Sequence, residues 1–283
     1  MAPIDDVGDE DLHRIDEALE AAREVFARYT PGEVEARRKS GDVPGFDPVF
    51  DPVTEADTEV DTLLRRLLPR DGEGWLSEET TDDPARLECE RVWVVDPLDG
   101  TREFVEGIPE WCVSVGLVIG GVPMAGGILN PVTGQKILGA RGRGVTLDGH
   151  PAQVSGRPGL AGATVLASRS EVRRKEWEGY REDLLTIRPC GSVAYKLAQV
   201  AAGLADATWT LVPKHEWDVA AGVALVLASG GTVWEESPGA EVRFNRPKPK
   251  LRRLLAAPPQ LVGEIEAEIA RRALTPGGVR AST

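Results

Sequence analysis

The stretch DPLDGTREF (Asp96–Phe104) follows the apolar run VWVV at positions 92–95. A β-branched and aromatic run that stops at an Asp-Pro pair predicts a buried strand with Asp96 at its carboxyl end, where the ligand crevices of α/β proteins form. Asp99 adds a second carboxylate, and Gly100 with Thr101 adds a permissive turn that offers backbone amides and a hydroxyl. We expect this stretch to receive a cation and an anion together.

An ordinary turn after a strand is the alternative for so short a peptide. Other carboxylates favour the functional interpretation, because Glu78 and Glu79 end the apolar segment 75–77 and Asp218 precedes the apolar stretch 219–228. Carboxylates about 4 Å apart repel each other by roughly 4 kcal/mol per pair at an effective dielectric near 20, so a cluster of them needs protons or metal ions. Oxygen ligands favour magnesium, calcium or manganese over zinc.

The chain has 283 residues, of which 41% are hydrophobic, and a formal net charge of −13. This length allows either one large domain or two closely packed halves. The negative charge argues against coating a nucleic acid polymer or an anionic membrane, since both need a basic surface. A phosphorylated substrate would therefore be received locally, by metal ions and a few basic side chains.

The cysteines and the amino terminus suggest a cellular location. Cys89, Cys112 and Cys190 are odd in number and far apart, which favours reduced thiols, and each is expected to pack in the core. The segment 1–11 is acidic and lacks the pattern of a signal peptide, and no apolar run reaches the length of a membrane span. We expect a cytoplasmic protein.

The amino-terminal part combines two helices with a meander of strands. Apolar residues at helical spacing predict a helix over 9–29, and Thr54 with Asp57 predicts the start of a second helix that ends before Pro69. The polar loop 37–51 between them places Asp51 just outside the second helix, where a functional carboxylate and a turn residue are equally common. Alternating apolar residues and turn signals predict strands over 111–154.

After a linker-like stretch at 155–162, strand-like runs alternate with helical ones. Strands are expected at 164–167, 207–212, 231–234 and 254–257, and helices at 171–184, 193–202, 219–228 and 261–273. Such alternation is typical of a layered α/β structure. We therefore divide the chain into an amino-terminal α+β half, 1–158, and a carboxy-terminal α/β half, 159–283.

Four signatures occur in order along the chain: DPVTEAD at 51–57, SEE at 77–79, DPLDGT at 96–101 and WDVAAG at 217–222. Together they resemble the inositol monophosphatase superfamily of magnesium-dependent, lithium-sensitive phosphatases, and the resemblance covers nearly the whole chain. It implies a layered αβαβα sandwich of the inositol monophosphatase and fructose-1,6-bisphosphatase type. One such motif would be weak, whereas all four in this order are highly specific.

The resemblance also implies roles for the motif residues. The metal ligands would be Glu78, Asp96, Asp99, Asp218 and the carbonyl oxygen of Leu98, with Glu79 assisting a further site through water. They would hold two or three Mg²⁺ ions, which Mn²⁺ could replace. Thr101 and Asp51 would orient and deprotonate the attacking water, and the backbone amides of Gly100 and Thr101 would hold the phosphate. Paired metal ions roughly 3.5 to 4 Å apart can activate water directly, so no phosphoenzyme is required.

Softer features resemble the CysQ-type 3'(2'),5'-bisphosphate nucleotidases, which would hydrolyse 3'-phosphoadenosine 5'-phosphate to AMP and phosphate. The sequence REF follows the DPLDGT motif, FNRP stands at 244–247, and the candidate substrate contacts are Ser192, Lys196, Arg169 and Glu216. Lys196 could meet a second phosphate, and its alternative role is a helix lysine whose stem packs on apolar surface. Arg169 lies between two serines that could instead cap a helix.

Other functions would leave different signatures. An inositol-1-monophosphatase, or a related sugar or histidinol phosphate phosphatase, would use the same metal site. A serine hydrolase built on Ser192 and His215 lacks a GxSxG elbow and would be insensitive to chelators. A non-catalytic acidic metal-binding module would keep the fold but release no phosphate. We expect a small phosphorylated metabolite as substrate, no nucleic acid polymer or membrane as partner, and a monomer or homodimer.

Overall fold

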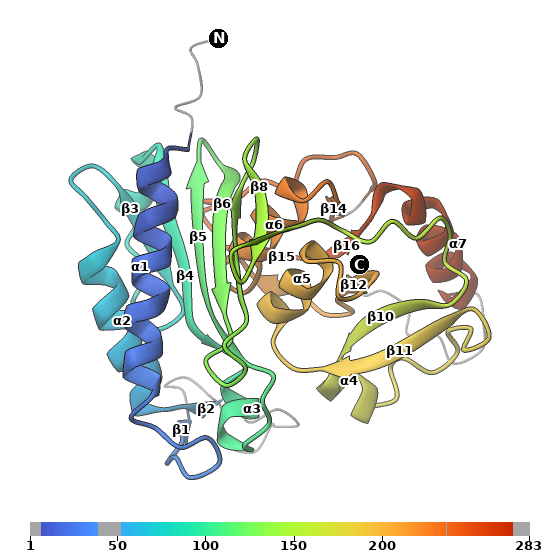
Figure 1. The fold of residues 1–283 in the computed structure, drawn as a ribbon, viewed down its shortest axis with the longest axis horizontal. Coiled ribbons are helices and arrows are strands. Elements are labelled where there is room, and N and C mark those ends of the chain that lie inside the picture. Colours follow the sequence, from blue (N-terminus) through green and yellow to red (C-terminus); the bar gives the residue numbers. More distant parts are fainter. Residues whose placement is uncertain (1–6, 39–51, 236, 274–283) are drawn as a thin grey trace.

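The computed structural model describes residues 7–38, 52–235 and 237–273. Its elements form five layers, which Figure 1 shows from left to right as two helices, a large sheet, two helices, a second sheet and a helix. The helices of these layers are α1 (Asp9–Phe26), α2 (Glu55–Leu67), α5 (Val193–Ala201), α6 (Glu216–Ala228) and α7 (Val262–Ala273). The layered αβαβα sandwich predicted from the sequence is confirmed, and the division at residue 158 stays a prediction.

The first sheet has its seven strands in chain order, and of these described pairs β3 with β4 is parallel and the others are antiparallel. The strands are β3 (Gly74–Ser77), β4 (Arg91–Asp99), β5 (Cys112–Ile119), β6 (Val122–Leu129), β7 (Lys136–Ala140), β8 (Gly144–Leu147) and β9 (His150–Ala152). Strands β5 to β9 are the meander predicted for 111–154. One face packs on α1 and α2, and the other packs on α5 and α6.

Helix α6 lies very close to the first sheet because β5 and β6 carry glycine where the helix approaches. A Cβ on Gly116 would lie 2.9 Å from the backbone nitrogen of Ala221, and a Cβ on Gly126 would lie 2.5 Å from its carbonyl oxygen. Either substitution would force the helix away from the sheet. The close approach brings the first turn of α6, with Asp218, to the end of β4, with Asp96.

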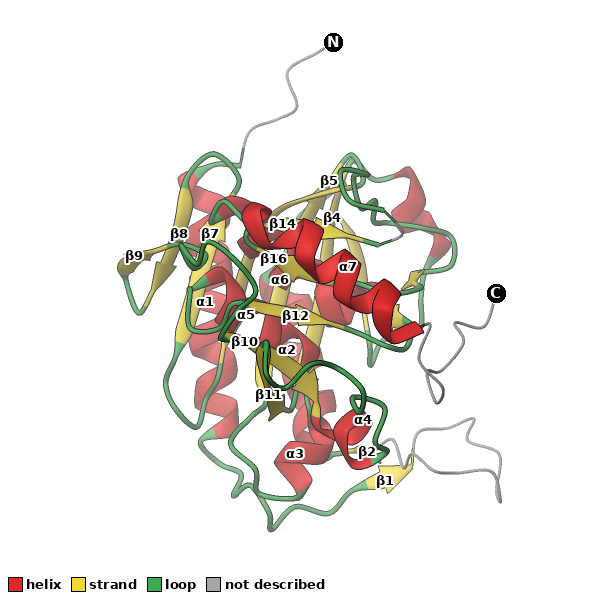
Figure 2. Ribbon diagram, turned by 90° about the vertical axis from the view of Figure 1, so that its right-hand side faces the viewer, coloured by secondary structure: helices red, strands yellow, loops and turns green. Residues whose placement is uncertain are grey.

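The second sheet has the order β11-β10-β12-β16-β14. It consists of β10 (Ala163–Ser168), β11 (Leu185–Cys190), β12 (Ala207–Trp209), β14 (Thr232–Trp234) and β16 (Leu255–Ala257). Strand β10 pairs parallel with β11 and β12, and β16 pairs antiparallel with β12 and β14. Figure 2, turned so that α7 faces the viewer, shows this helix covering the sheet.

The helix predicted at 171–184 is wrong for most of its length. Helix α4 covers only Arg169–Arg173, and β11, which was not predicted, follows after a stretch of turns. Lys175 and Gly179 have φ values of 63° and 89°, which no right-handed helix accommodates. The reason is tertiary, because Trp177 and Tyr180 pack with Trp209 in the core of the second sheet.

A buried ionic group joins α1 to the first sheet. Glu73 accepts two hydrogen bonds from Arg14, at 3.2 and 2.5 Å, and others from Arg91 and the indole of Trp93. The Arg14 and Glu73 side chains are each 8% exposed. Burial opposes ionisation of Glu73, but the hydrogen bonds from Arg14 and Trp93 outweigh it and lower its pKa to about 2.

Glu73→Gln is expected to lower the free energy of unfolding at pH 7 by about 2 to 3 kcal/mol, since lowering a carboxyl pKa from 4.5 to about 2 corresponds to about 3 kcal/mol. The folded-state pKa lies below the unfolded-state value, so this contribution is complete above pH 4.5 and is lost as the pH falls toward 2. Urea unfolding at pH 7 and at low pH measures both effects. Glu17→Gln, at an exposed position of α1, is the control and should change stability by less than about 0.5 kcal/mol.

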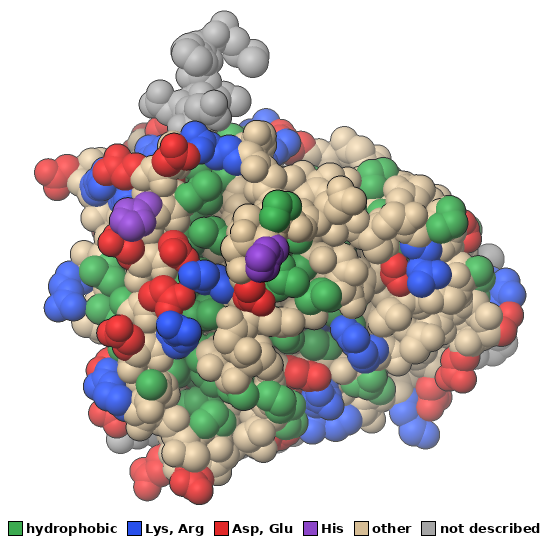
Figure 3. Space-filling model, viewed as in Figure 1, with side chains coloured by type: hydrophobic (Ala, Val, Ile, Leu, Met, Phe, Trp, Pro, Cys, Tyr) green, Lys and Arg blue, Asp and Glu red, His purple; other side chains and the backbone are tan. Residues whose placement is uncertain are grey.

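The surface and the helices bear on possible partners. Within the described chain, no helix combines the length and the apolar character that crossing a membrane requires. On the face shown in Figure 3, acidic and basic side chains are interspersed over the α1 side of the molecule. The described residues of this face therefore offer no continuous basic surface for a nucleic acid polymer.

Candidate active site

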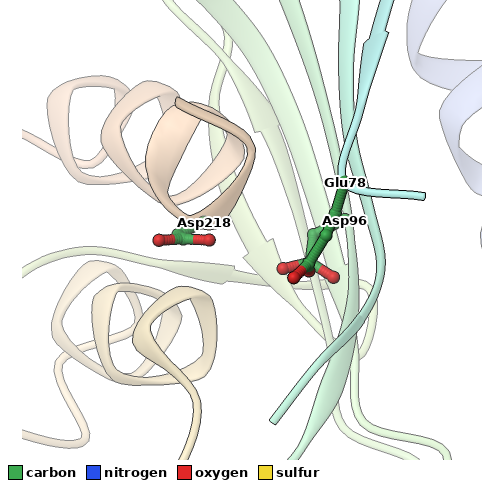
Figure 4. A group of neighbouring side chains, drawn as sticks. All are labelled: Glu78, Asp96 and Asp218. Carbon is green, nitrogen blue, oxygen red and sulfur yellow. The ribbon is translucent and has the colours of Figure 1, made fainter. Parts of the chain in front are cut away.

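Three carboxylates from two adjacent layers, the first sheet and helix α6, converge at one edge of the first sheet. Glu78 directly follows β3, Asp96 lies in β4, and Asp218 lies in the first turn of α6 (Figure 4). One carboxylate oxygen of each lies within 4.8 Å of the others. The donor set is hard oxygen throughout, and such closely spaced negative charges need a cation, so these residues fit Mg²⁺ or Mn²⁺.

Strand β4 runs further than predicted, through the Asp-Pro pair to Asp99. The ladder between β4 and β5 is irregular from Asp96 to Asp99, and Pro97 lies in this interruption, where its missing N–H breaks no regular ladder bond. Asp96 Oδ1 accepts a hydrogen bond of 3.0 Å from the backbone N–H of Leu98. The interruption lies between Asp96 and Asp99, so one strand end carries both of these carboxylates.

Asp99 is held by the carboxy-terminal part of the chain. Its Oδ2 accepts hydrogen bonds from the hydroxyl of Ser192 (2.7 Å) and the backbone N–H of Ala194 (2.5 Å), at the start of α5. Ser192 adopts a φ of 49°, an unusual value for a residue other than glycine. Its hydroxyl is thereby directed to Asp99, so Ser192 supports a predicted metal ligand, while its role in substrate binding stays a prediction.

The turn that carries Glu78 and Glu79 is anchored to α2. The hydroxyl of Ser77 donates to one oxygen of Asp61, and that of Thr80 donates to the other, both at 2.5 Å. Ser77 is buried, whereas Glu78 and Glu79 are half-buried. These bonds fix the backbone on both sides of the two glutamates, although Glu79 is not among the described residues that line the cavity below.

A hydroxyl–carboxylate pair lies beside this group. Thr101 begins the short helix α3 (Thr101–Val105), after Gly100 at a φ of 99°, and its Oγ1 lies 3.0 Å from the carbonyl oxygen of Leu98 and 3.2 Å from Oδ1 of Asp57. Asp57 is 1% exposed, and burial raises its pKa to about 6. Asp51, the predicted partner of Thr101, lies outside the described residues.

Asp57 was predicted only as a helix-capping residue. It does cap α2, since its Oδ2 accepts hydrogen bonds from the backbone N–H (2.8 Å) and the hydroxyl (2.5 Å) of Thr54. The second oxygen reaches Thr101, which is remote in the sequence. The Thr-x-x-Asp spacing explains the cap, whereas the contact with Thr101 arises from the packing of α2 and α3 around the end of β4.

A cavity of about 710 Å³ contains most of the predicted site. Its lining includes Glu78, Asp96, Leu98, Asp99, Gly100, Thr101, Ser192, Lys196 and Asp218, and also the unpredicted Lys214, Lys250 and Trp217. Lys214 and Lys250 are brought together by the antiparallel pairing of β13 (Lys214–His215) with β15 (Lys250–Leu251). The closeness of Lys214 to the WD motif was an available signal, whereas nothing in the sequence pointed to Lys250.

The predicted substrate contacts separate into two kinds. Lys196 lines the cavity although it is 2% exposed, and burial together with nearby Lys214 lowers its pKa. Arg169 instead forms an ion pair with Glu110, and Glu216 is fully buried and accepts hydrogen bonds from backbone amides. Protein groups therefore already bind both side chains. Neither Arg169 nor Glu216 is among the described residues that line the cavity.

Residues 10–273 match the model of the inositol monophosphatase family. The chain belongs to this family. An inositol monophosphatase of Mesembryanthemum crystallinum is 35% identical over 173 residues, which cover 58% of this chain and 64% of that protein. The Nus factor SuhB of Pseudomonas aeruginosa is 37% identical over 152 residues, or 50% and 55% of the two chains. The matches thus span less than two thirds of the length of these relatives.

Solved structures of the family share the fold. The suppressor protein SuhB from Bartonella henselae superimposes with a TM-score of 0.76 at 25% identity, covering 93% of this chain and 99% of that one. CysQ from Bacteroides thetaiotaomicron superimposes with a TM-score of 0.70 at 23% identity, covering 88% and 97%. The likeness to CysQ shows the fold alone, so the choice of substrate has to be argued from the residues of the cavity.

Proposed function

We propose that this chain is a metal-dependent phosphomonoesterase that transfers the phosphoryl group of a small metabolite directly to water. The observation that carries the proposal is the convergence of Glu78, Asp96 and Asp218 in the same cavity as Thr101, whose hydroxyl contacts Asp57. A cation bound by the three carboxylates would supply charge neutralisation for the phosphate and a lowered pKa for water. Asp99 and Leu98, which also hold predicted ligand atoms, line the same cavity.

The chain itself would orient the nucleophile and the phosphate. The Leu98 carbonyl and Asp57 are alternative acceptors for the one proton of the Thr101 hydroxyl. When that proton points to Asp57, the hydroxyl oxygen can accept a hydrogen bond from an attacking water. The pKa of about 6 leaves Asp57 mostly ionised at neutral pH, so it can hold the proton that the water loses. The backbone amides of Gly100 and Thr101, which line the cavity, would hold the phosphate oxygens.

Removal of divalent metal tests this activity. Phosphate release should disappear in chelator and return with added Mg²⁺ or Mn²⁺, because the donor set is hard oxygen throughout. The colorimetric assay is run on 3'-phosphoadenosine 5'-phosphate and on inositol 1-phosphate. Activity that survives chelation would favour a hydrolase that uses a protein nucleophile, and absence of phosphate release from any small phosphate ester would favour a non-catalytic metal-binding module.

For the substrate, we propose a nucleotide with two phosphates, hydrolysed as by a 3'(2'),5'-bisphosphate nucleotidase. Lys196, Lys214 and Lys250 line the same cavity as the carboxylates, in a chain of net charge −13. A buried cation such as Lys196 is stabilised by nearby anions, and Glu171 and Asp99 already act on it electrostatically. The second phosphate would be a further anion for Lys196, because the metal ions would serve the phosphate that is cleaved. An inositol monophosphatase is the second candidate, favoured by the name of the Mesembryanthemum crystallinum relative.

Lys196→Met is expected to lower kcat/KM for 3'-phosphoadenosine 5'-phosphate by about 10- to 150-fold, since a hydrogen bond to a charged group contributes roughly 1.5 to 3 kcal/mol. Methionine preserves most of the volume of the buried side chain. Steady-state kinetics on both substrates measure the effect, and hydrolysis of inositol 1-phosphate should change much less.

Lys136→Met is the matched control, because Lys136 forms ion pairs with Asp16 and Glu20 and is not among the described residues that line the cavity. It should leave the rates on both substrates unchanged. Faster hydrolysis of inositol 1-phosphate than of the bisphosphate by the wild type would favour the inositol monophosphatase candidate and leave the metal chemistry intact.

A further inference from the structure

The buried carboxylate of Glu216 holds the start of α6 in place. It accepts hydrogen bonds from the backbone N–H groups of Asn245 (2.8 Å) and Arg246 (3.1 Å). Glu216 is fully buried and stands two positions before Asp218 in the chain. The first turn of α6 therefore cannot move away from the turn at 244–246 without leaving a buried carboxyl group short of hydrogen-bond donors, which is costly.

Asn245 connects the same turn to the segment that follows Glu78. Arg86, in the 3₁₀ helix η1 (Pro84–Glu88), donates to Oδ1 of Asn245 at 2.6 Å, and Nδ2 of Asn245 donates to the carbonyl oxygen of Arg86 at 3.1 Å. Arg86 also donates to both carboxylate oxygens of Asp82, at 2.6 and 2.8 Å. The Arg86 side chain is 1% exposed, so these bonds are shielded from water.

The backbone of Asn245 is suited to hold both connections. Its φ is 57°, in the left-handed region that asparagine and glycine adopt at low cost. In this conformation its N–H meets Glu216 while its side chain meets Arg86. Asn245 thus joins the segment after β3 to the first turn of α6, beside a second bond of 3.0 Å that Arg86 donates to the carbonyl oxygen of Arg246.

We propose that Arg86, Asn245 and Glu216 form a brace that sets the distance between Glu78 and Asp218. These residues are positioning residues for the metal site, and the inference rests on the proposed function. Glu78 and Asp218 belong to different layers, yet their oxygens lie within 4.8 Å of each other. Two carboxylates at such a distance repel each other until a cation binds, and the brace opposes their separation. Its loss should therefore weaken metal binding more than turnover at saturating metal.

Asn245→Gly tests the brace, because glycine accepts a φ of 57° and keeps the N–H for Glu216. The two bonds between the Asn245 side chain and Arg86 are lost, and the bond from Arg86 to the Arg246 carbonyl remains. The affinity for Mn²⁺ is measured without substrate, from the electron paramagnetic resonance signal of free Mn²⁺ on titration. We expect roughly 10-fold weaker binding, as is usual when groups that support metal ligands are removed. Turnover at saturating metal should stay within about threefold of the wild type.

Asp148→Gly is the matched control. Asp148 also has a positive φ, 50°, and its side chain also accepts a hydrogen bond, from the N–H of Lys136, but it lies in the turn between β8 and β9. It should leave Mn²⁺ affinity unchanged even if it lowers the melting temperature as much as Asn245→Gly does. Asn245→Asp, which keeps an acceptor for Arg86, should recover part of the affinity.

Two outcomes would overturn the brace. One is an Asn245→Gly variant that binds Mn²⁺ within twofold of the wild type, and the other is an equal loss of affinity in Asp148→Gly. Either result would leave the proposed phosphatase function standing, because that function depends on whether the wild type needs metal to release phosphate. Failure of the wild type to bind Mn²⁺ at all would reject both proposals together.

Discussion

Asp96→Asn is expected to lower phosphatase turnover by more than about 100-fold, because a missing charge leaves a site for paired metal ions incomplete. Asp96 is 1% exposed, and one of its carboxylate oxygens lies within 4.8 Å of those of Glu78 and Asp218. Its charge is therefore expected to be essential to the group. The amide keeps the size of the side chain and an oxygen for the Leu98 N–H. The loss should therefore concern charge, with the fold preserved.

Two measurements separate these effects. The Mn²⁺ titration should show weakened binding, and circular dichroism should show an unchanged structure. Asp183→Asn, at an exposed residue paired with Arg181, is the control and should behave as the wild type does. Near-normal turnover in Asp96→Asn would reject the metal site as the catalytic centre.

Asp57→Asn is expected to lower turnover by about 100-fold or more, the usual range for loss of a general base, while Mn²⁺ binding survives. The asparagine side chain would still cap α2 through its carbonyl oxygen, so the helix should form. In the wild type, turnover should fall as the pH drops through about 6, where Asp57 takes up a proton. This acidic limb should be absent from the residual activity of the variant.

Thr101 provides the companion test, because it contacts Asp57 directly. Thr101→Val removes the hydroxyl at nearly constant shape and should cost about as much as Asp57→Asn, whereas Thr101→Ser should retain most activity. The double variant Asp57→Asn with Thr101→Val should be no slower than either single variant, since residues that act as a unit are not additive. Additive losses, or a loss of metal affinity of similar size, would show that the pair supports the fold instead of the chemistry.

The carboxylates of the proposed metal site could be found in the sequence because their signals are local. An apolar run that stops at Asp96-Pro97 leaves a carboxylate at the carboxyl end of that run wherever the strand lies in the molecule. The capping of α2 by Thr54 and Asp57 is local in the same sense, and the structure contains it. Four motifs in order were enough to predict the layered fold and the family, both of which are confirmed.

The surroundings of the ligands could not be predicted, because they depend on contacts between segments that are distant in the sequence. The sequence assigned Asp57 to a helix cap, and only the packing of α2 against β4, which leads into α3, brings its second oxygen to Thr101. Lys250 joins Lys214 through the pairing of β15 with β13. The contacts between residues that are distant in the sequence depend on which layers pack together. The spacing of residues within one segment carries no information about that packing.

The wrong helix at 171–184 and the unpredicted strand β11 have the same physical cause. The apolar residues at 171–184 fit a helical period, but Trp177 and Tyr180 gain more from packing on Trp209 than from a regular helix, so the chain turns and leads into β11. The sequence by itself determined which carboxylates lie near the ends of β3 and β4 and at the start of α6. The tertiary structure decided which hydroxyl, lysine or backbone amide each of them meets, because burial and hydrogen bonding act between layers that the chain joins only when it is folded.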